Sequence, residues 1–208
     1  MELARLYAIV DRGTLDARGV RVSAFARELQ AAGVRLLQYR DKDGSPQQVL
    51  EAAEEIARIF AGSGARLLLN DRADLAVLAG WDGVHVGQGD LPPEAARRVL
   101  GESKILGVST HSETQVRAAE SSSADYVAVG PVFATGSKAD AEPVIGLEGV
   151  RRARALTAKP IVAIGGITRE TAASVIEAGA DSVAVIGALL VPGERPGEVA
   201  RDFLERLR

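Results

Sequence analysis

Cysteine is absent from the chain, and histidine occurs only twice in 208 residues. Without cysteine the chain can form no disulfide, no thiolate metal site and no cysteine nucleophile. A strong excess of one charge is missing too, since the net charge is −3. This balance argues against a general surface for nucleic acid or anionic membranes, so any bound anion must be held by a local cluster of cations.

Long hydrophobic runs are missing as well. The first residues, MELARLYAIVDRG, contain no basic region followed by a long apolar stretch, so we expect no secretory signal. The longest uncharged apolar stretch, residues 183–193, is too short to cross a bilayer. We therefore expect a cytoplasmic protein, and the hydrophobic content of 47% is ample for one large core.

Short apolar runs recur along the chain, with helical patterns between them. The expected strands are Leu6–Val10, Leu36–Arg40, Arg66–Asn70, Gly83–Val86, Lys104–Ser109, Tyr126–Val132, Pro160–Gly165 and Ser182–Ile186. Runs such as YVAVGPV and PIVAIGG are apolar almost throughout, which is typical of parallel strands covered on both faces. Apolar residues at three- and four-residue spacing predict helices at Pro46–Ala61, after Ser45, and at Thr168–Ala178.

Eight strands alternating with helices favour an α/β fold, a single (β/α)8 TIM barrel over residues 1–208. An open doubly wound sheet is the alternative, but no GxGxxG motif follows the first strand. In such barrels the carboxyl ends of the strands and the loops after them form the active site. Nearly every predicted strand ends in polar or glycine-rich residues, so we expect one site built from many strand ends.

The stretch LLQYRDK begins like a buried strand and ends in charged residues. Gln38, Arg40 and Lys42 alternate, so their side chains point to one side of an extended chain. An amide, a guanidinium and an ammonium on one face indicate a site for a negative ligand. At the mouth of a barrel, the expected ligand is a diphosphate.

Two aspartates follow neighbouring predicted strands. Asp71 ends the third strand and Asp90 follows the fourth, so both carboxylates can meet at the mouth. Two oxygen ligands without cysteine or a histidine pair suit Mg²⁺ better than zinc, and Mg²⁺ often binds one or two carboxylates plus substrate phosphates. The alternative is that Asp71 pairs with Arg40 or Arg72, while Asp90 caps the helix that starts near Pro92.

A second anion site is expected after the seventh and eighth strands. Gly165 and Gly166 in AIGGIT let the backbone approach a ligand closely, and Ile186 and Gly187 lie at a turn into a further helix. Loops at these places form a recurrent phosphate site in (β/α)8 barrels, built from backbone N–H groups and a helix N-terminus. The alternative is tight packing of small residues at a strand end.

The segment at residues 130–146, GPVFATGSKADAEPVIG, joins the two expected sites. It offers hydroxyls on Thr135 and Ser137 and a cation on Lys138, so it can act as a lid or be an ordinary surface loop. Ser109 can face the mouth, whereas His85 can line the barrel or satisfy a buried polar contact. No local motif supports a Ser/His/Asp nucleophilic set.

The motifs QYRDK, NDR, VHVGQGDLP, GVSTHS, GPVFATGSK and AIGGIT occur in this order over almost the whole chain. Together they resemble the thiamine phosphate synthases, a family of (β/α)8 barrels. That family joins a pyrimidine methyl diphosphate to a thiazole phosphate with Mg²⁺ and releases pyrophosphate. The resemblance implies a transferase with two phosphorylated small-molecule substrates, no nucleic acid or membrane partner, and a homo-oligomeric state.

The resemblance also assigns roles to individual residues. The pyrimidine diphosphate would be held by Gln38, Tyr39, Arg40, Asp41, Lys42, Asn70, Ser109 and Lys138. The thiazole phosphate would be received by Thr135, Gly136, Ser137, Gly166, Ile186 and Gly187. Mg²⁺ would be held by Asp71 and Asp90, and the candidate catalytic residues are Arg40, Lys42, Ser109 and Lys138. Mg²⁺, Arg40, Lys42 and Lys138 would neutralise the charge on departing pyrophosphate, so no enzyme nucleophile is required.

Three positions depart from the family pattern. The family often has Pro, Thr and Ser where this chain has Ala134, Ser137 and Gly187. Ser137 keeps a hydroxyl, whereas Gly187 keeps only its N–H, which predicts a weaker affinity for the thiazole phosphate. A related barrel that isomerises the thiazole phosphate, or a regulatory protein on the same scaffold, remains the alternative function.

Overall fold

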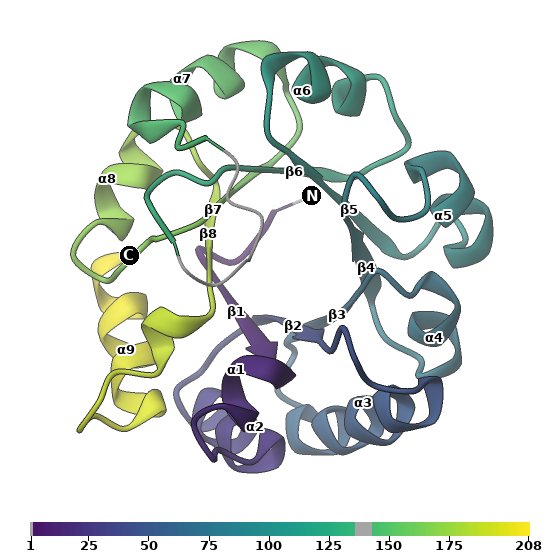
Figure 1. Cartoon of the computed structure of the whole chain (residues 1–208), viewed down its shortest axis with the longest axis vertical. Helices are drawn as coiled ribbons and strands as arrows, with labels where there is room; N and C mark the ends of the chain where they lie inside the picture. Colours follow the sequence, from purple (N-terminus) through teal and green to yellow (C-terminus); the bar gives the residue numbers. More distant parts are fainter. Residues whose placement is uncertain (1, 136–142) are drawn as a thin grey trace.

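The computed structural model describes residues 2–135 and 143–208. In this part of the chain parallel strands close into a barrel in the order β1 to β8, with helices around it (Figure 1). The strands are β1 (Leu6–Asp11), β2 (Leu36–Arg40), β3 (Arg66–Asn70), β4 (Gly83–Val86), β5 (Ile105–Thr110), β6 (Tyr126–Val129), β7 (Ile161–Ile164) and β8 (Ser182–Val185). The helices are α1 (Arg12–Asp16), α2 (Val22–Ala31), α3 (Pro46–Phe60), α4 (Ala73–Leu78), α5 (Pro93–Leu100), α6 (Glu113–Glu120), α7 (Gly146–Leu156), α8 (Ala172–Glu177), the short 3₁₀ helix η1 (Gly187–Leu189) and α9 (Pro196–Arg206).

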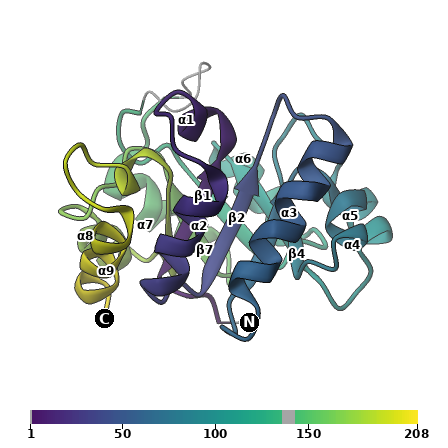
Figure 2. The ribbon, with the colours of Figure 1, turned by 90° about the horizontal axis from the view of Figure 1, so that it is seen from below.

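The first and last strands close the barrel, because Ala8 pairs with Leu37 of β2 while Leu6 pairs with Val183 of β8. All strands run the same way, so their carboxyl ends share one end of the molecule. Figure 2 shows this end at the top, where β2 points and α1 lies, with the C-terminus at the other end. The predicted (β/α)8 barrel is confirmed.

Predicted and observed boundaries agree for β2, β3 and β4 and differ elsewhere by a few residues. Strand β6 ends at Val129 rather than Val132. The backbone at Gly130 passes so close to β7 that a Cβ there would lie 2.2 Å from the carbonyl oxygen of Ile164. Helix α8 begins at Ala172 rather than Thr168, because the Thr168 N–H is bound by Thr171 Oγ1 at 3.0 Å in a turn.

Helix α3 illustrates how the sequence sets a helix start. The Ser45 side chain accepts a hydrogen bond from the Gln48 N–H at 3.3 Å, and the Gln48 side chain accepts one from the Ser45 N–H at 2.9 Å. This capping box satisfies two N–H groups that the first turn leaves unpaired. Val49, Ala53 and Ile56 then bury one face of the helix against the barrel.

Three aspartates fix the amino ends of neighbouring strands, and we call these contacts the strand-base clamps. Asp82 donates its N–H to the Leu67 carbonyl at 2.9 Å and accepts the Leu67 N–H at 2.7 Å. Asp125 forms the same reciprocal pair with Leu106, and Asp181 forms it with Ile161. Each aspartate directly precedes an even-numbered strand, so a clamp joins β3 to β4, β5 to β6 and β7 to β8.

The hydrophobic residues form two layers. The larger lies between the strands and the helices, and the smaller fills the inside of the barrel. The inner layer includes Leu36, Leu68 and Ile105, with two buried phenols, Tyr7 and Tyr126, further along the axis. The barrel is therefore a packed core that supports a cavity at its carboxyl end.

Candidate active site

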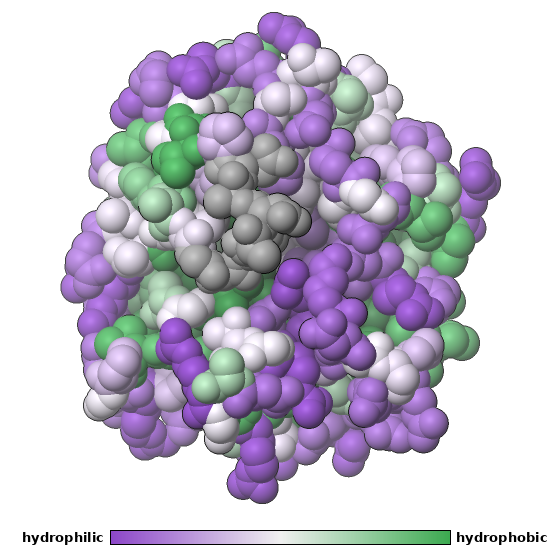
Figure 3. All heavy atoms as spheres, in the orientation of Figure 1, coloured by the Kyte–Doolittle hydropathy of each residue, from purple (hydrophilic) through white to green (hydrophobic). Residues whose placement is uncertain are grey.

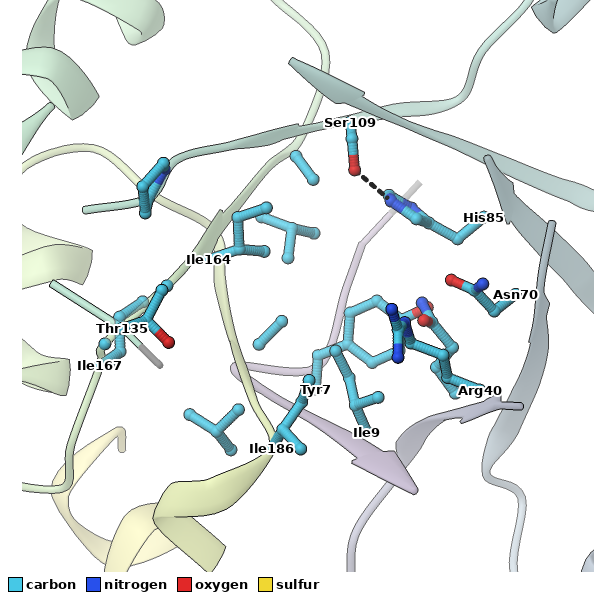
Figure 4. Close-up of a pocket in the computed structure, with 18 of the residues that line it drawn as sticks. Tyr7, Ile9, Arg40, Asn70, His85, Ser109, Thr135, Ile164, Ile167 and Ile186 are labelled. Carbon is cyan, nitrogen blue, oxygen red and sulfur yellow. Dashed lines mark hydrogen bonds between the residues drawn. The ribbon is translucent and has the colours of Figure 1, made fainter. Parts of the chain in front are cut away.

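A cavity of about 570 Å³ opens at the carboxyl ends of the strands. Its two sides differ in chemistry: polar side chains on β2 to β5 face apolar ones on β7 and β8 (Figure 4). Figure 3 shows the same asymmetry around the mouth, where hydrophilic residues gather over the ends of β2, β3 and β4. Most predicted site residues line this cavity, namely Gln38, Arg40, Lys42, Asn70, Asp71, Asp90, Ser109, Thr135, Gly166, Ile186 and Gly187.

Arg40 is held at the mouth by Asp11, a residue that the sequence did not single out. Arg40 Nη1 lies 2.5 Å from Asp11 Oδ2. Asp11 Oδ1 accepts hydrogen bonds from the Thr14 N–H at 2.8 Å and the Thr14 hydroxyl at 2.6 Å, which caps α1. Burial acts to raise the pKa of Asp11, but the bonds from Thr14 and Arg40 outweigh it and hold the pKa below its usual value. Asp11 therefore stays charged and orients the guanidinium.

Tyr39 and Asp41 are not among the residues that line the cavity, so the structure does not bring them together with the other predicted site residues. Strand alternation points them away from the side that carries Gln38 and Arg40, and Tyr39 is buried in the layer beneath the helices. The Tyr39 hydroxyl donates to Asp41 at 3.1 Å, and the Gly44 N–H donates to Asp41 at 2.8 Å. These bonds shape the loop after β2, which carries Lys42.

Asp71 adopts an unusual backbone conformation. Its φ of 62° is the only positive value for a non-glycine residue in the described part of the chain. Aspartate tolerates this left-handed region better than most residues, but the conformation stores strain of a kind that clusters at functional sites. The Asp71 N–H bonds the His85 carbonyl at 2.7 Å, and the carboxylate forms an ion pair with Lys42. The strand end thus turns the carboxylate into the mouth.

The carboxyl groups of Asp71 and Asp90 lie close enough to share a hydrogen bond. Burial is the main reason that the pKa of Asp71 is raised, Asp90 raises it further, and Lys42 opposes both. Burial also acts to raise the pKa of Asp90, but its bonds with Asp71 and the Gly87 N–H leave that pKa below the usual value. Two half-buried carboxyls in contact cannot both ionise without cost, so this corner of the cavity favours a bound cation.

Neither alternative for the two aspartates is realised. Asp71 pairs with Lys42, whereas Arg72 pairs with Asp74. Helix α5 has Pro92 at its N-cap without a side-chain bond, so Asp90 does not cap it. Both carboxylates line one corner of the cavity, and their role as metal ligands stays a prediction.

The donor set fits Mg²⁺. Within residues 2–135 and 143–208 no group of three or more His, Cys, Asp or Glu side chains gathers as a metal cage. Mg²⁺ does not need such a cage, because it commonly binds one or two carboxylates and completes its shell with water and substrate phosphate. Asp71 and Asp90 would hold it there, beside the cationic side chains of Lys42 and Arg40.

The polar side continues down to the barrel floor. His85 Nε2 lies 2.8 Å from the Ser109 hydroxyl, and Nδ1 lies 2.8 Å from the Tyr126 hydroxyl (Figure 4). His85 therefore both lines the cavity and satisfies buried polar groups, so both roles that the sequence suggested for it are found. Tyr7 lines the same floor and was not predicted, although as the second residue of LYAIVD it alternates with Leu6 and Ala8 and so points into the barrel.

The opposite side is built from backbone. Gly165 and Gly166 have φ values of 92° and 65°, which few residues other than glycine adopt. A Cβ on Gly166 would lie 2.4 Å from the carbonyl oxygen of Ala134, so the two loops touch. Gly187 is the first residue of η1 and lines the cavity with Ile186. Thr135 joins this side, whereas Gly136, Ser137 and Lys138 lie outside the described residues.

A closed (β/α)8 barrel with a charged cavity at the carboxyl ends of its strands is the arrangement found in barrel enzymes. A family model described as thiamine monophosphate synthase matches residues 6–189. The thiamine-phosphate synthase of Koribacter versatilis is 52% identical over 209 residues, which cover all of this chain and 97% of the relative. The thiamine-phosphate synthase of Methanosarcina barkeri is 41% identical over 97% of this chain and 90% of the relative.

A solved structure agrees with these sequence relatives. The thiamine phosphate pyrophosphorylase from Pyrococcus furiosus matches with a TM-score of 0.87 and 30% identity, over 98% of this chain and 95% of that chain. The chain belongs to the thiamine monophosphate synthase family, and it is therefore a transferase of thiamine biosynthesis. In the described residues, no helix has the length and apolar character needed to span a membrane.

Proposed function

We propose that the chain condenses a pyrimidine methyl diphosphate with a thiazole phosphate in a Mg²⁺-dependent reaction that yields thiamine phosphate and pyrophosphate. One observation supports this most strongly. A carboxylate pair with two adjacent cations faces a backbone-lined pocket across a single cavity of about 570 Å³. The first side suits a diphosphate with its metal, and the second suits a monophosphate.

The charged side would bind and activate the diphosphate. Asp71 and Asp90 would hold Mg²⁺, which when bound would neutralise charge on the leaving pyrophosphate. Arg40 and Lys42 would contact the same phosphates, and Asn70 lies near Arg40 on the cavity wall (Figure 4). Positive groups placed before the reaction stabilise charge as it develops, which supplies a large share of catalysis in such sites.

The deeper polar residues would hold the pyrimidine. Gln38 and Ser109 line the floor and offer an amide and a hydroxyl to a heterocycle. On the other side Gly166, Gly187 and Thr135 would receive the thiazole phosphate through backbone N–H groups and a hydroxyl. Lys138, Ser137 and Gly136 complete these assignments as sequence predictions. Alignment of the thiazole nitrogen with the pyrimidine methylene then requires no enzyme nucleophile.

One assay tests the proposal. The purified protein is incubated with both phosphorylated precursors and Mg²⁺, and release of pyrophosphate and formation of thiamine phosphate are followed together. Equal yields of both products are expected, with none when either precursor or Mg²⁺ is omitted. Isomerisation of the thiazole phosphate alone would favour the related isomerase, and binding without turnover would favour a regulatory protein.

We propose that the chain acts in the cytoplasm. The homo-oligomeric state expected from the family is tested by light scattering after size-exclusion chromatography. A mass near the chain mass of 21.8 kDa would contradict it.

A further inference from the structure

A row of hydrogen bonds crosses the barrel floor and joins five strands. Gln38 Nε2 donates to the Tyr7 hydroxyl at 2.9 Å, and the Tyr7 and Tyr126 hydroxyls lie 3.2 Å apart. The Tyr126 hydroxyl lies 2.8 Å from His85 Nδ1, and His85 Nε2 lies 2.8 Å from the Ser109 hydroxyl. Gln38, Tyr7, His85 and Ser109 line the cavity, whereas Tyr126 is fully buried beneath them.

The residues around Tyr126 fix the position of its ring. A Cβ on Gly107 of β5 would lie 2.0 Å from the Tyr126 ring, so only glycine leaves room for it. The ring stacks on His85 with centroids 5.6 Å apart and meets Tyr7 edge to face at 6.3 Å. These contacts fix the hydroxyl between its two partners.

The chemistry of the groups gives the row a direction. Burial raises the pKa of Tyr7 to about 12 and raises that of Tyr126 as well, so both phenols keep their hydrogens near neutral pH. The Gln38 amide nitrogen can only donate, so the Tyr7 oxygen accepts. Tyr7 then donates to Tyr126, and Tyr126 donates to His85 Nδ1. A neutral ring that accepts at Nδ1 carries its hydrogen on Nε2 and donates to Ser109.

The opposite direction leaves a buried hydrogen without an acceptor. If Tyr126 donated to Tyr7, the Tyr7 oxygen would accept twice and its own hydrogen would need another partner. Tyr7 is 1% exposed, and in the described residues its hydroxyl bonds only Gln38 and Tyr126. An unsatisfied buried donor is costly, so the first direction is favoured.

We propose that Tyr126 is a positioning residue that holds His85 as the Nε2–H tautomer, so that Ser109 presents its hydroxyl hydrogen to the cavity. This inference rests on the proposed function, because it specifies which hydrogen-bonding groups of the barrel floor would recognise the pyrimidine. The Gln38 carbonyl oxygen is an acceptor on the same cavity floor. The floor therefore offers a donor from Ser109 and an acceptor from Gln38 to a heterocycle that carries both an acceptor and an N–H donor.

The ¹⁵N spectrum of labelled histidine tests the tautomer without substrate. The chain has two histidines, and a His111→Gln variant assigns the signals. At about pH 8.5, where ordinary histidine is neutral, His85 is expected to carry its hydrogen on Nε2. Tyr126→Phe should shift the signals toward the Nδ1–H form, whereas Ser109→Ala should leave them at Nε2–H. A wild-type Nδ1–H ring or imidazolium would overturn the proposal, even if Tyr126→Phe fails to fold.

Kinetics supply the second readout. Tyr126→Phe is expected to raise KM for the pyrimidine diphosphate about tenfold and to change KM for the thiazole phosphate less than about twofold. Thr110→Val is the matched control, because it removes one buried hydroxyl bond, 2.9 Å to the Ala128 carbonyl, and Thr110 itself does not line the cavity. Equal rises in both KM values, or no change in either, would overturn the proposal. Turnover by the wild type tests the proposed function separately.

Discussion

Aspartates at the two ends of the barrel have opposite surroundings. At the amino end, the strand-base clamps give Asp82, Asp125 and Asp181 a backbone N–H donor each at 2.7 Å. At the carboxyl end, Asp71 and Asp90 crowd each other, and Asp71 sits in a left-handed conformation. Aspartate holds strands together at one end, and at the other end it concentrates negative charge around the cationic side chain of Lys42. This division separates stability from chemistry along the barrel axis.

The largest expected effect comes from removing charge at the carboxyl end. Asp71→Asn and Asp90→Asn should each lower kcat/KM about 10²- to 10³-fold, because the metal loses a charged ligand. Asparagine tolerates a positive φ, so the Asp71 variant should fold normally. Pyrophosphate release measured across a Mg²⁺ titration checks this. Wild-type rates in both variants at limiting Mg²⁺ would contradict the metal assignment.

The converse change at the amino end should cost stability instead. Asp125→Ala removes an acceptor for the Leu106 N–H and the 2.7 Å partner of Arg97, whose side chain is 8% exposed. We expect a loss of about 2 kcal/mol in the free energy of unfolding. Urea denaturation measures it, and kcat/KM per folded molecule should stay unchanged. A catalytic defect without a loss of stability would break the comparison between the two ends.

Asp11→Asn should give a smaller, selective effect at the mouth. Without the carboxylate Arg40 is no longer oriented, so KM for the diphosphate should rise about fivefold with little change for the thiazole phosphate. The lowered pKa of Asp11 stabilises the fold above its unfolded value of about 3.9, and this contribution is lost as pH falls through the folded pKa. The difference in unfolding free energy between wild type and variant should therefore shrink below about pH 4. A constant difference down to lower pH would contradict the assigned ion pair.

The smallest effects concern the backbone-lined side. Gly187→Ser adds a hydroxyl at the start of η1 and should lower KM for the thiazole phosphate about threefold. Gly166→Ala should act the other way, because φ is 65° and the new Cβ would meet the Ala134 carbonyl at 2.4 Å. Initial rates with varied thiazole phosphate measure both. A rise in KM for the diphosphate alone would show that Gly187 serves the other substrate.

The sequence predicted the barrel and most of the cavity because both depend on local patterns. Strand alternation placed Gln38, Arg40 and Lys42 on one side, and the structure agrees. The resemblance, however, assigned substrate contacts to all five residues of QYRDK. The same alternation directs the side chains of Tyr39 and Asp41 to the outside of the barrel, where they bond each other. Residues that fall together in a motif need not share a face of the strand.

Other features of the site depend on contacts that no local pattern contains. Tyr126 and Tyr7 are 119 positions apart, and their hydroxyls meet only when the barrel closes. Nothing in NDR shows that Asp71 takes a positive φ, a conformation in which its N–H bonds the carbonyl of His85 on the next strand. From the sequence, Asp11 is only a residue at the end of a strand, and the structure alone shows its bond to Arg40.

The strand-base clamps also bear on the order in which the chain assembles. Each clamp joins residues only 15 to 20 positions apart, Asp82 to Leu67, Asp125 to Leu106 and Asp181 to Ile161. Such short separations can form soon after the second strand of a pair leaves the ribosome, before the first and last strands meet. During synthesis the pairs β3–β4, β5–β6 and β7–β8 can thus form in their final register first. Pairing of β1 with β8, which closes the barrel, is then the last long-range step.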